Sequence, residues 1–178
     1  FLGLLDPACL EQHPGRIHPG HAAALQGIDD HEDDPLHRRA SSVGMTAPAL
    51  AGTNYEGEAV AITPGEDGPL LVVFLAHWCP HCNSEVPRLN QLRDEGRFPE
   101  GLDIVAVSTA INPGRPNFPP SEWIEDVDWT YPVIADGVDM ARGTFIGADA
   151  YGVDGFPFTV LLDDAGQVAA RWSGEREP

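Results

Sequence analysis

The most hydrophobic segment of the chain runs from Leu70 to Ala76, and every residue in it is apolar. A run of this length, bounded by Pro69 and by polar residues from His77 onward, predicts a strand that is buried on both faces of a sheet. Residues 102–108, with the sequence LDIVAVS, predict a second buried strand. The two runs therefore predict a sheet whose central strands are covered on both sides.

The segment between these two strands changes to helical spacing. Apolar residues recur at Val86, Leu89 and Leu92, which lie on one face of a helix spanning Cys79 to Asp94. Pro87 stands inside this segment, so we expect it to kink the helix. The helix begins directly after the first strand, with only a short turn between them.

The remaining segments are shorter and predict both strands and helices. Ser121 follows a Pro-rich loop and precedes Glu122 and Glu125, which is typical of a helix with Ser121 as its N-cap. Strand–helix alternation followed by a terminal hairpin predicts an α/β fold, with a mixed central sheet and helices on both of its faces. The other predicted elements are an N-terminal β-hairpin of residues 47–50 and 58–62, a strand over 131–135, a helix over 140–150, and a hairpin of 158–162 and 167–172.

Residues 1–42 differ in composition from the rest of the chain. They contain five of the seven histidines and the acidic cluster of residues 29–34, but few residues that could bury a face. We interpret them as a flexible or linker-like arm, and residues 43–178 as the folded domain. The alternative is a metal site made by His13, His18 and His21 with the acidic cluster, although this spacing matches no strong zinc signature.

The chain carries a net charge of −18, and all ten of its basic residues are arginines. Such a surface repels phosphate backbones and anionic lipids, which argues against nucleic-acid binding. No apolar run approaches the roughly 20 residues that span a bilayer. The chain begins at Phe1 without a methionine, and removal of a signal peptide or anchor is one interpretation of this start.

The candidate chemistry lies in the sequence Cys79-Pro80-His81-Cys82, directly after the first buried strand. A sulfur at the N-terminus of a helix is favoured as a thiolate by the backbone N–H groups and the helix dipole. We therefore expect Cys79 to attack a substrate and Cys82, one turn further in, to resolve the mixed disulfide. The third cysteine, Cys9, is an incidental thiol in the arm, and it cannot supply the second pair that a zinc ribbon needs.

Three polar residues near this motif are candidates for assisting the cysteines. His81 stands between them and can donate a hydrogen bond or a positive charge to the Cys79 thiolate, unless it is only an exposed turn residue. Glu85 lies three residues after Cys82 on the same helical face, where a buried carboxylate can take the thiol proton; the alternative is an exposed helix glutamate. His77 either approaches the motif or faces solvent at the strand end.

The chain resembles the thioredoxin superfamily over residues 43–173, and it is most similar to the extracytoplasmic TlpA/ResA-like branch of thiol–disulfide oxidoreductases. Three segments carry the resemblance: residues 72–82 with the strand and Trp-Cys-x-x-Cys, residues 82–87 (CNSEVP), and residues 151–160 (YGVDGFPFTV). The resemblance implies a three-layer thioredoxin-like fold. It also implies that Pro157 is cis and faces Cys79, with Phe156, Trp78 and Pro80 forming the surface that substrates contact.

The sequence departs from the family pattern at three places, and the first of them leaves the direction of electron flow open. The Pro80-His81 dipeptide is similar to that of the oxidising DsbA group, whereas the surrounding sequence resembles reductases. Val73 stands six residues before Cys79, where many thioredoxins have a buried acid. The chain also ends at Pro178, where the family usually adds a closing helix.

These observations predict an extracytoplasmic thiol–disulfide oxidoreductase that acts on protein cysteines and exchanges electrons with a redox partner, membrane-bound or not. We expect it to need no cofactor. The alternative is a copper carrier using the Cys79 and Cys82 thiolates, but copper-assembly relatives have three residues between the cysteines and a distant histidine, and none follows Gly137 here. A peroxiredoxin-type peroxidase would need threonine at the position of Ala76.

Overall fold

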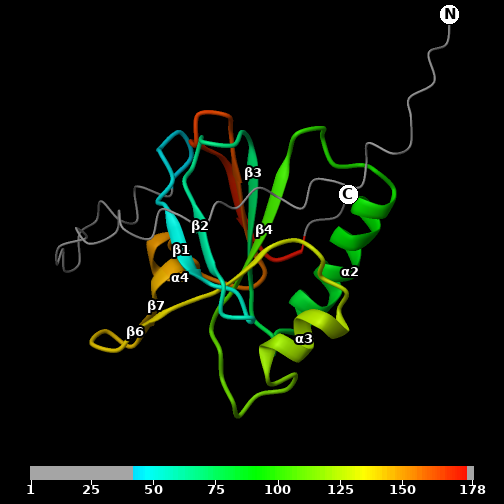
Figure 1. The fold of residues 1–178 in the computed structure, drawn as a ribbon, viewed down its shortest axis with the longest axis vertical. Coiled ribbons are helices and arrows are strands. Elements are labelled where there is room, and N and C mark those ends of the chain that lie inside the picture. Colours follow the sequence, from blue (N-terminus) through cyan, green and yellow to red (C-terminus); the bar gives the residue numbers. More distant parts are fainter. Residues whose placement is uncertain (1–41, 176–178) are drawn as a thin grey trace, which may run out of the picture.

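The computed structural model describes residues 42–175. The predicted arm of residues 1–42, with Cys9 and its histidines, therefore lies outside the described residues apart from its last position. Seven strands form one mixed sheet in the order β2-β1-β5-β4-β3-β8-β9 (Figure 1). They are β1 (Leu50–Thr53), β2 (Ala59–Ile62), β3 (Leu70–Leu75), β4 (Asp103–Ser108), β5 (Val133–Ala135), β8 (Phe158–Leu162) and β9 (Val168–Ser173).

The centre of the sheet is parallel and its margins are antiparallel. Strand β3 pairs with β4 in parallel and with β8 in antiparallel orientation, and β4 pairs with β5 in parallel. The β1–β2 and β8–β9 hairpins close the two ends of the sheet. This arrangement confirms the predicted mixed sheet with an N-terminal and a terminal hairpin.

Strand β3 is covered on both faces, as its uninterrupted apolar sequence predicts. Leu71, Val73 and Leu75 belong to one buried cluster, whereas Val72 and Phe74 belong to a second cluster on the opposite face. Successive side chains of a strand point to opposite faces. When both faces of the sheet are covered, every side chain of the strand is buried, so apolar residues are favoured at every position. The site that follows β3 therefore rests on a strand that is buried from Leu71 to Leu75.

Helices cover both faces of the sheet, which makes three layers. Helices α2 (Pro80–Asp94) and α3 (Pro120–Asp126) lie together on one side, and the short helix α4 (Ile146–Ala150) lies apart from them (Figure 1). Val86 and Leu89 of α2 and Trp123 of α3 pack into the cluster with Val73, while Tyr151, directly after α4, packs into the cluster with Phe74. The predicted thioredoxin-like three-layer fold is confirmed.

The N-cap predicted for the second helix is wrong. Ser121 is not an N-cap, because α3 already begins at Pro120 with Pro119 as its N-cap residue. Proline fits the first helical position, where its fixed φ suits the helix and its missing N–H would have no partner. Helix α2, by contrast, spans the predicted residues from Pro80 with Cys79 as N-cap, and it continues through Pro87.

The predicted helix over residues 140–150 is restricted to its last five residues. The preceding segment forms a small two-stranded ribbon of β6 (Val138–Asp139) and β7 (Thr144–Phe145). Gly143 has a φ of 68°, the left-handed conformation that a continuous right-handed helix does not contain.

The first strand of the N-terminal hairpin lies at Leu50–Thr53 instead of the predicted residues 47–50. Asn54 accepts hydrogen bonds from the N–H groups of Glu56 and Glu58 and so sets the turn after Thr53.

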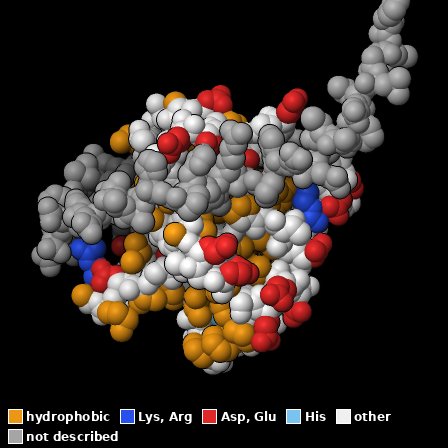
Figure 2. Space-filling view, in the orientation of Figure 1, with side chains coloured by type: hydrophobic (Ala, Val, Ile, Leu, Met, Phe, Trp, Pro, Cys, Tyr) orange, Lys and Arg blue, Asp and Glu red, His pale blue; other side chains and the backbone are white. Residues whose placement is uncertain are grey.

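The surface of the domain reflects its acidic composition. Figure 2 shows acidic side chains scattered over the face in view, with basic side chains confined to two places near its margins. Across residues 42–175, no helix has both the length and the apolar character needed to cross a membrane.

Candidate active site

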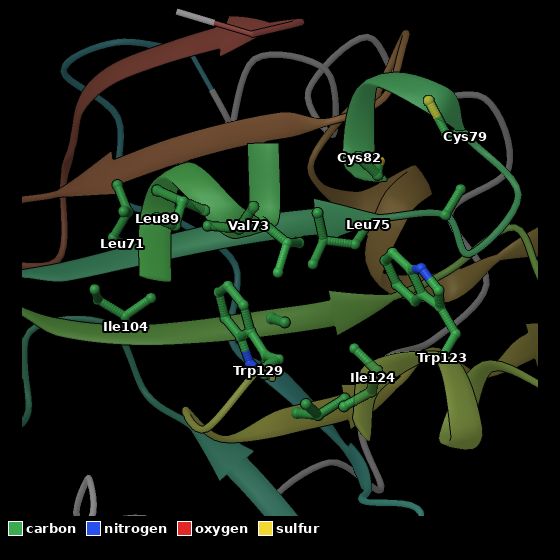
Figure 3. Close-up of a cluster of buried hydrophobic side chains, with 14 residues drawn as sticks. Leu71, Val73, Leu75, Cys79, Cys82, Leu89, Ile104, Trp123, Ile124 and Trp129 are labelled. Atoms are coloured by element: carbon green, nitrogen blue, oxygen red, sulfur yellow. The ribbon is translucent and has the colours of Figure 1, made fainter. Parts of the chain in front are cut away.

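The two cysteines lie where β3 passes into α2. The N–H of Cys79 donates to the carbonyl of Ala76 at 2.9 Å, which closes the turn between strand and helix. Both cysteines are free thiols; Cys79 is 6% exposed and Cys82 is fully buried. Figure 3 shows them at one end of the buried cluster, beyond Leu75 and far from Leu89. The first sulfur is thus the one that solvent reaches, whereas the attacking and resolving roles of the two cysteines stay predictions.

The segment before β8 brings Phe156 and Pro157 to the first cysteine. The Phe156–Pro157 peptide bond is cis, as expected, and Cys79 Sγ lies 3.4 Å from the carbonyl oxygen of Phe156. This approach follows from topology, because β8 lies next to β3 in the sheet and begins where β3 ends. The backbone beside Phe156 is therefore placed to meet a chain that reacts with Cys79.

Cys82 lies in an environment that keeps its sulfur protonated. Burial raises the pKa of the Cys82 thiol well above its usual value, and nearby negative charge on Cys79 or Glu85 raises it further. The backbone of Ala76 opposes this effect with a hydrogen bond. A thiol of this kind reacts only when a neighbouring base takes its proton.

Glu85 is the candidate for that base. It is 6% exposed and follows Cys82 by three residues on the same face of α2. Burial raises the pKa of the Glu85 carboxyl, and the negative charge of Glu175 raises it further. Arg88 lowers this pKa, and its Nη1 donates a hydrogen bond to Glu85 Oε2 at 3.2 Å. The carboxyl is therefore more basic than an exposed glutamate and better matched to a thiol.

His81 is directed toward the C-terminal segment. Its side chain is 70% exposed, and its Nδ1 lies 2.8 Å from Oε1 of Glu175. The segment reaches this place because the N–H of Gly174 donates to the carbonyl of Pro157 at 2.7 Å. The structure thus gives His81 a carboxylate partner rather than the predicted hydrogen bond to Cys79.

Trp78 and Phe156 form an aromatic surface beside the cysteines. Their rings meet edge to face with centroids 6.0 Å apart, and the half-buried indole of Trp78 donates to the carbonyl of Ala110 at 2.8 Å. Pro80 is exposed at the start of α2. Trp78, Pro80 and Phe156 thus lie around the motif, and their contact with substrates stays a prediction.

His77 is a structural residue that the sequence left undecided, and the solvent-facing alternative is wrong. It is fully buried; its Nε2 accepts the N–H of Asn112 at 3.2 Å, and its Nδ1 lies 2.7 Å from the carbonyl of Pro116. Because Nε2 is the acceptor, the proton must be on Nδ1, which donates to Pro116. A neutral imidazole therefore joins the end of β3 to the loop after β4.

Asn83 is a residue that sequence reasoning missed. Its Nδ2 donates to the carbonyl of Cys79 at 2.8 Å, and its Oδ1 accepts the indole N–H of Trp123 at 2.9 Å. The amide thus links the first turn of α2 to α3 and holds the backbone of the first cysteine. No local signal marks it, since asparagine in a first helical turn is ordinarily exposed.

Sequence comparisons identify the chain's relatives. The family model described as the AhpC/TSA family matches residues 43–170. The thiol-disulfide oxidoreductase ResA of Geobacillus thermodenitrificans is 30% identical over 135 residues, which cover 74% of this chain and 69% of ResA. ResA of Geobacillus kaustophilus is 28% identical over 131 residues, with the same coverage of 74% and 69%. The predicted resemblance to the ResA-like branch is confirmed.

Solved structures agree with these relatives. A thiol:disulfide interchange protein DsbE from Chlorobium tepidum superposes with a TM-score of 0.61 and 25% identity, covering 76% of this chain and 87% of that chain. StoA from Bacillus subtilis shares the fold with a TM-score of 0.56 and 20% identity, covering 72% and 90%.

The copper-carrier alternative finds no support. Within the described part of the chain, no three His, Cys, Asp or Glu side chains gather as they would around a metal ion. The relatives carry the names of thiol-disulfide oxidoreductases and thiol:disulfide interchange proteins, not of copper carriers. The chain therefore belongs to the AhpC/TSA family, and it is a thiol–disulfide oxidoreductase with a thioredoxin-like fold.

Proposed function

We propose that Cys79 and Cys82 are the redox pair of this oxidoreductase, and that it reduces disulfides in polypeptide substrates. The observation that carries the assignment is the pairing of an N-cap sulfur, 6% exposed, with a fully buried second sulfur three residues later in α2. This order of accessibility separates an attacking thiolate from a resolving thiol.

The reaction has two exchange steps. The Cys79 thiolate attacks one sulfur of the substrate disulfide, forms a mixed disulfide and releases the other substrate sulfur as a thiolate. Glu85 then takes the proton of Cys82, and the Cys82 thiolate attacks Cys79 Sγ. A Cys79–Cys82 disulfide forms, the second substrate sulfur leaves, and two electrons have passed from the protein to the substrate. A redox partner must afterwards reduce Cys79–Cys82.

The charges around the pair favour the reducing direction. A positive charge near the first cysteine stabilises its thiolate and makes a protein more oxidising, whereas negative charge has the opposite effect. His81 is held by Glu175 at 2.8 Å, and Glu175 also acts on the nearby Glu85 carboxyl. The positive charge of His81, which would favour the oxidising direction, is thus offset by the negative charges of Glu175 and Glu85. The disulfide form of the pair is stabilised relative to the dithiol form.

The reduction potential of the Cys79–Cys82 pair tests the direction. We would equilibrate the protein with glutathione buffers and follow the fluorescence of Trp78 and the other indoles. A value near or below about −270 mV supports a reductase, and a value near about −120 mV would make the protein an oxidant and contradict the proposed direction.

His81 and Glu175 should shift this potential in opposite directions. We expect His81→Pro to lower it and Glu175→Gln to raise it, each by about 5–20 mV, because the pair is largely exposed and solvent screens it. The same glutathione equilibration measures both. An unchanged potential in His81→Pro would remove His81 from the mechanism.

The place of action is part of this proposal. Protein disulfides persist in oxidising compartments, so a reductase of polypeptide disulfides has its substrates outside the cytosol. We propose that the protein is exported or anchored at a membrane. Its substrates are protein thiols or disulfides, and its electrons come from a separate redox partner.

A further inference from the structure

The loop of residues 110–118, between β4 and α3, is fastened to the active-site motif by side-chain hydrogen bonds. The buried His77 ring bonds the backbone of Asn112 and of Pro116, and Asn117 Nδ2 donates to the carbonyl of His77 at 2.8 Å. Trp78 adds its bond to the carbonyl of Ala110. Two adjacent residues before Cys79 thus hold the loop at both of its ends.

The loop places one cation against the active-site aromatic surface. The guanidinium carbon of Arg115 lies 4.7 Å from the centroid of the Trp78 ring. Trp78 directly precedes Cys79, and its ring also meets Phe156, whose carbonyl contacts Cys79 Sγ. Arg115 is exposed, so its charge faces the solvent from which a substrate approaches.

Arg115 differs from the other arginines of the described residues. Arg88, Arg93, Arg97 and Arg142 each pair with a carboxylate. Arg171 donates to the carbonyls of Tyr151 and Gly152. Among residues 42–175, Arg115 alone has only the ring contact and no ion pair. In a chain with 28 acidic and ten basic residues, an arginine without a carboxylate partner therefore lies over the ring of the residue that precedes Cys79.

We propose that Arg115 is a specificity-determining residue that binds an acidic side chain of the substrate polypeptide close to its reactive cysteine. This inference rests on the proposed function. Stacking on Trp78 holds the guanidinium in place while leaving its N–H donors free, so little side-chain freedom is lost when a carboxylate binds. His77 acts as the positioning residue, because it fixes the loop that carries Arg115.

The proposal is tested with two peptides that each contain one disulfide and differ only in having glutamate or glutamine on both sides of the cysteine that reacts. The measured quantity is the ratio of kcat/KM for the glutamate peptide to kcat/KM for the glutamine peptide. The protein's net charge of −18 repels acidic peptides in general, so the ratio must be compared between variants.

Arg97→Gln supplies the matched control, because it makes the same charge change at an exposed arginine away from the motif. We expect the ratio in Arg115→Gln to be about two- to fivefold lower than the ratio in Arg97→Gln. This range corresponds to the loss of one exposed ion pair. The excess should disappear in about 1 M salt, where the Debye length is about 3 Å.

The outcomes separate this inference from the function on which it rests. Equal ratios in the Arg115→Gln and Arg97→Gln variants, with both peptides reduced, would overturn the role of Arg115 and leave the reductase proposal intact. Failure of the folded wild-type protein to reduce either peptide would contradict the proposed function and the inference together.

Discussion

Replacing Cys79 with serine is expected to reduce disulfide turnover to the uncatalysed background. A serine hydroxyl is not ionised at neutral pH, so no nucleophile remains at the start of α2. The fold should persist, because serine is close to cysteine in size and its hydroxyl can donate to the Phe156 carbonyl that Cys79 Sγ now contacts at 3.4 Å. The measurement is insulin-disulfide reduction driven by a dithiol, with circular dichroism to check folding.

Two companion variants make this result specific to the pair. Cys82→Ser should still attack substrates but accumulate mixed disulfides on Cys79, since the resolving thiol is missing; mass spectrometry detects them. Cys9→Ser is the matched control for the loss of a thiol and should turn over like the wild type. Full activity in the Cys79 variant would refute the assignment of the redox pair.

Glu85→Gln is expected to slow the resolving step by roughly 10²-fold or more, the usual contribution of a general base. The Cys82 thiol is fully buried and its raised pKa keeps it protonated, so it depends on a neighbouring acceptor. Rapid-mixing kinetics of mixed-disulfide decay would measure the step. Glu122→Gln, a change at an exposed glutamate of α3, is the control and should have no effect.

The pH dependence of the same step distinguishes proton transfer from a structural role. Glu85 accepts a proton only when ionised, so the rate of the resolving step should rise with pH through a pKa higher than that of an ordinary glutamate. Glu85→Gln should lack this rise. An unchanged pH profile in the variant would show that another group deprotonates Cys82.

Loss of stability does not explain the expected effect of Glu85→Gln. A carboxyl whose pKa is raised by folding binds its proton more tightly in the folded state than in the unfolded state. The folded state is therefore favoured below the unfolded-state pKa, and this advantage is lost as the pH rises through the raised pKa. Above it the buried charge is a cost that glutamine does not carry.

The candidate site residues that could be predicted are those whose spacing along one element determines where they lie. Cys79, Cys82 and Glu85 occupy the first turns of α2, so their shared face follows from helical geometry. The buried state of β3 was equally evident, because an apolar residue at every position requires cover on both faces. Pro157, 78 residues after Cys79 in the sequence, was assigned only through resemblance to a family.

The failures occurred where the local sequence contained signals for more than one structure. Residues 140–150 contain helix-favouring alanines but also Gly143, and the left-handed φ of that glycine leaves only Ile146–Ala150 helical. At α3, two prolines begin the helix before Ser121 can cap it. Each outcome depended on a backbone conformation that composition does not specify.

The sequence by itself determined the family, the fold class and the position of the proposed redox pair, because these depend on continuous apolar runs and on residues spaced within one helix. Only the tertiary structure decided what surrounds that pair. His77 meets Pro116 across 39 residues and His81 meets Glu175 across 94 residues. Arg115 reaches Trp78 from the loop between β4 and α3. Such contacts arise when strands that are far apart in the chain become neighbours in the sheet. The topology of the sheet, and not the local spacing of residues, therefore sets which residues meet.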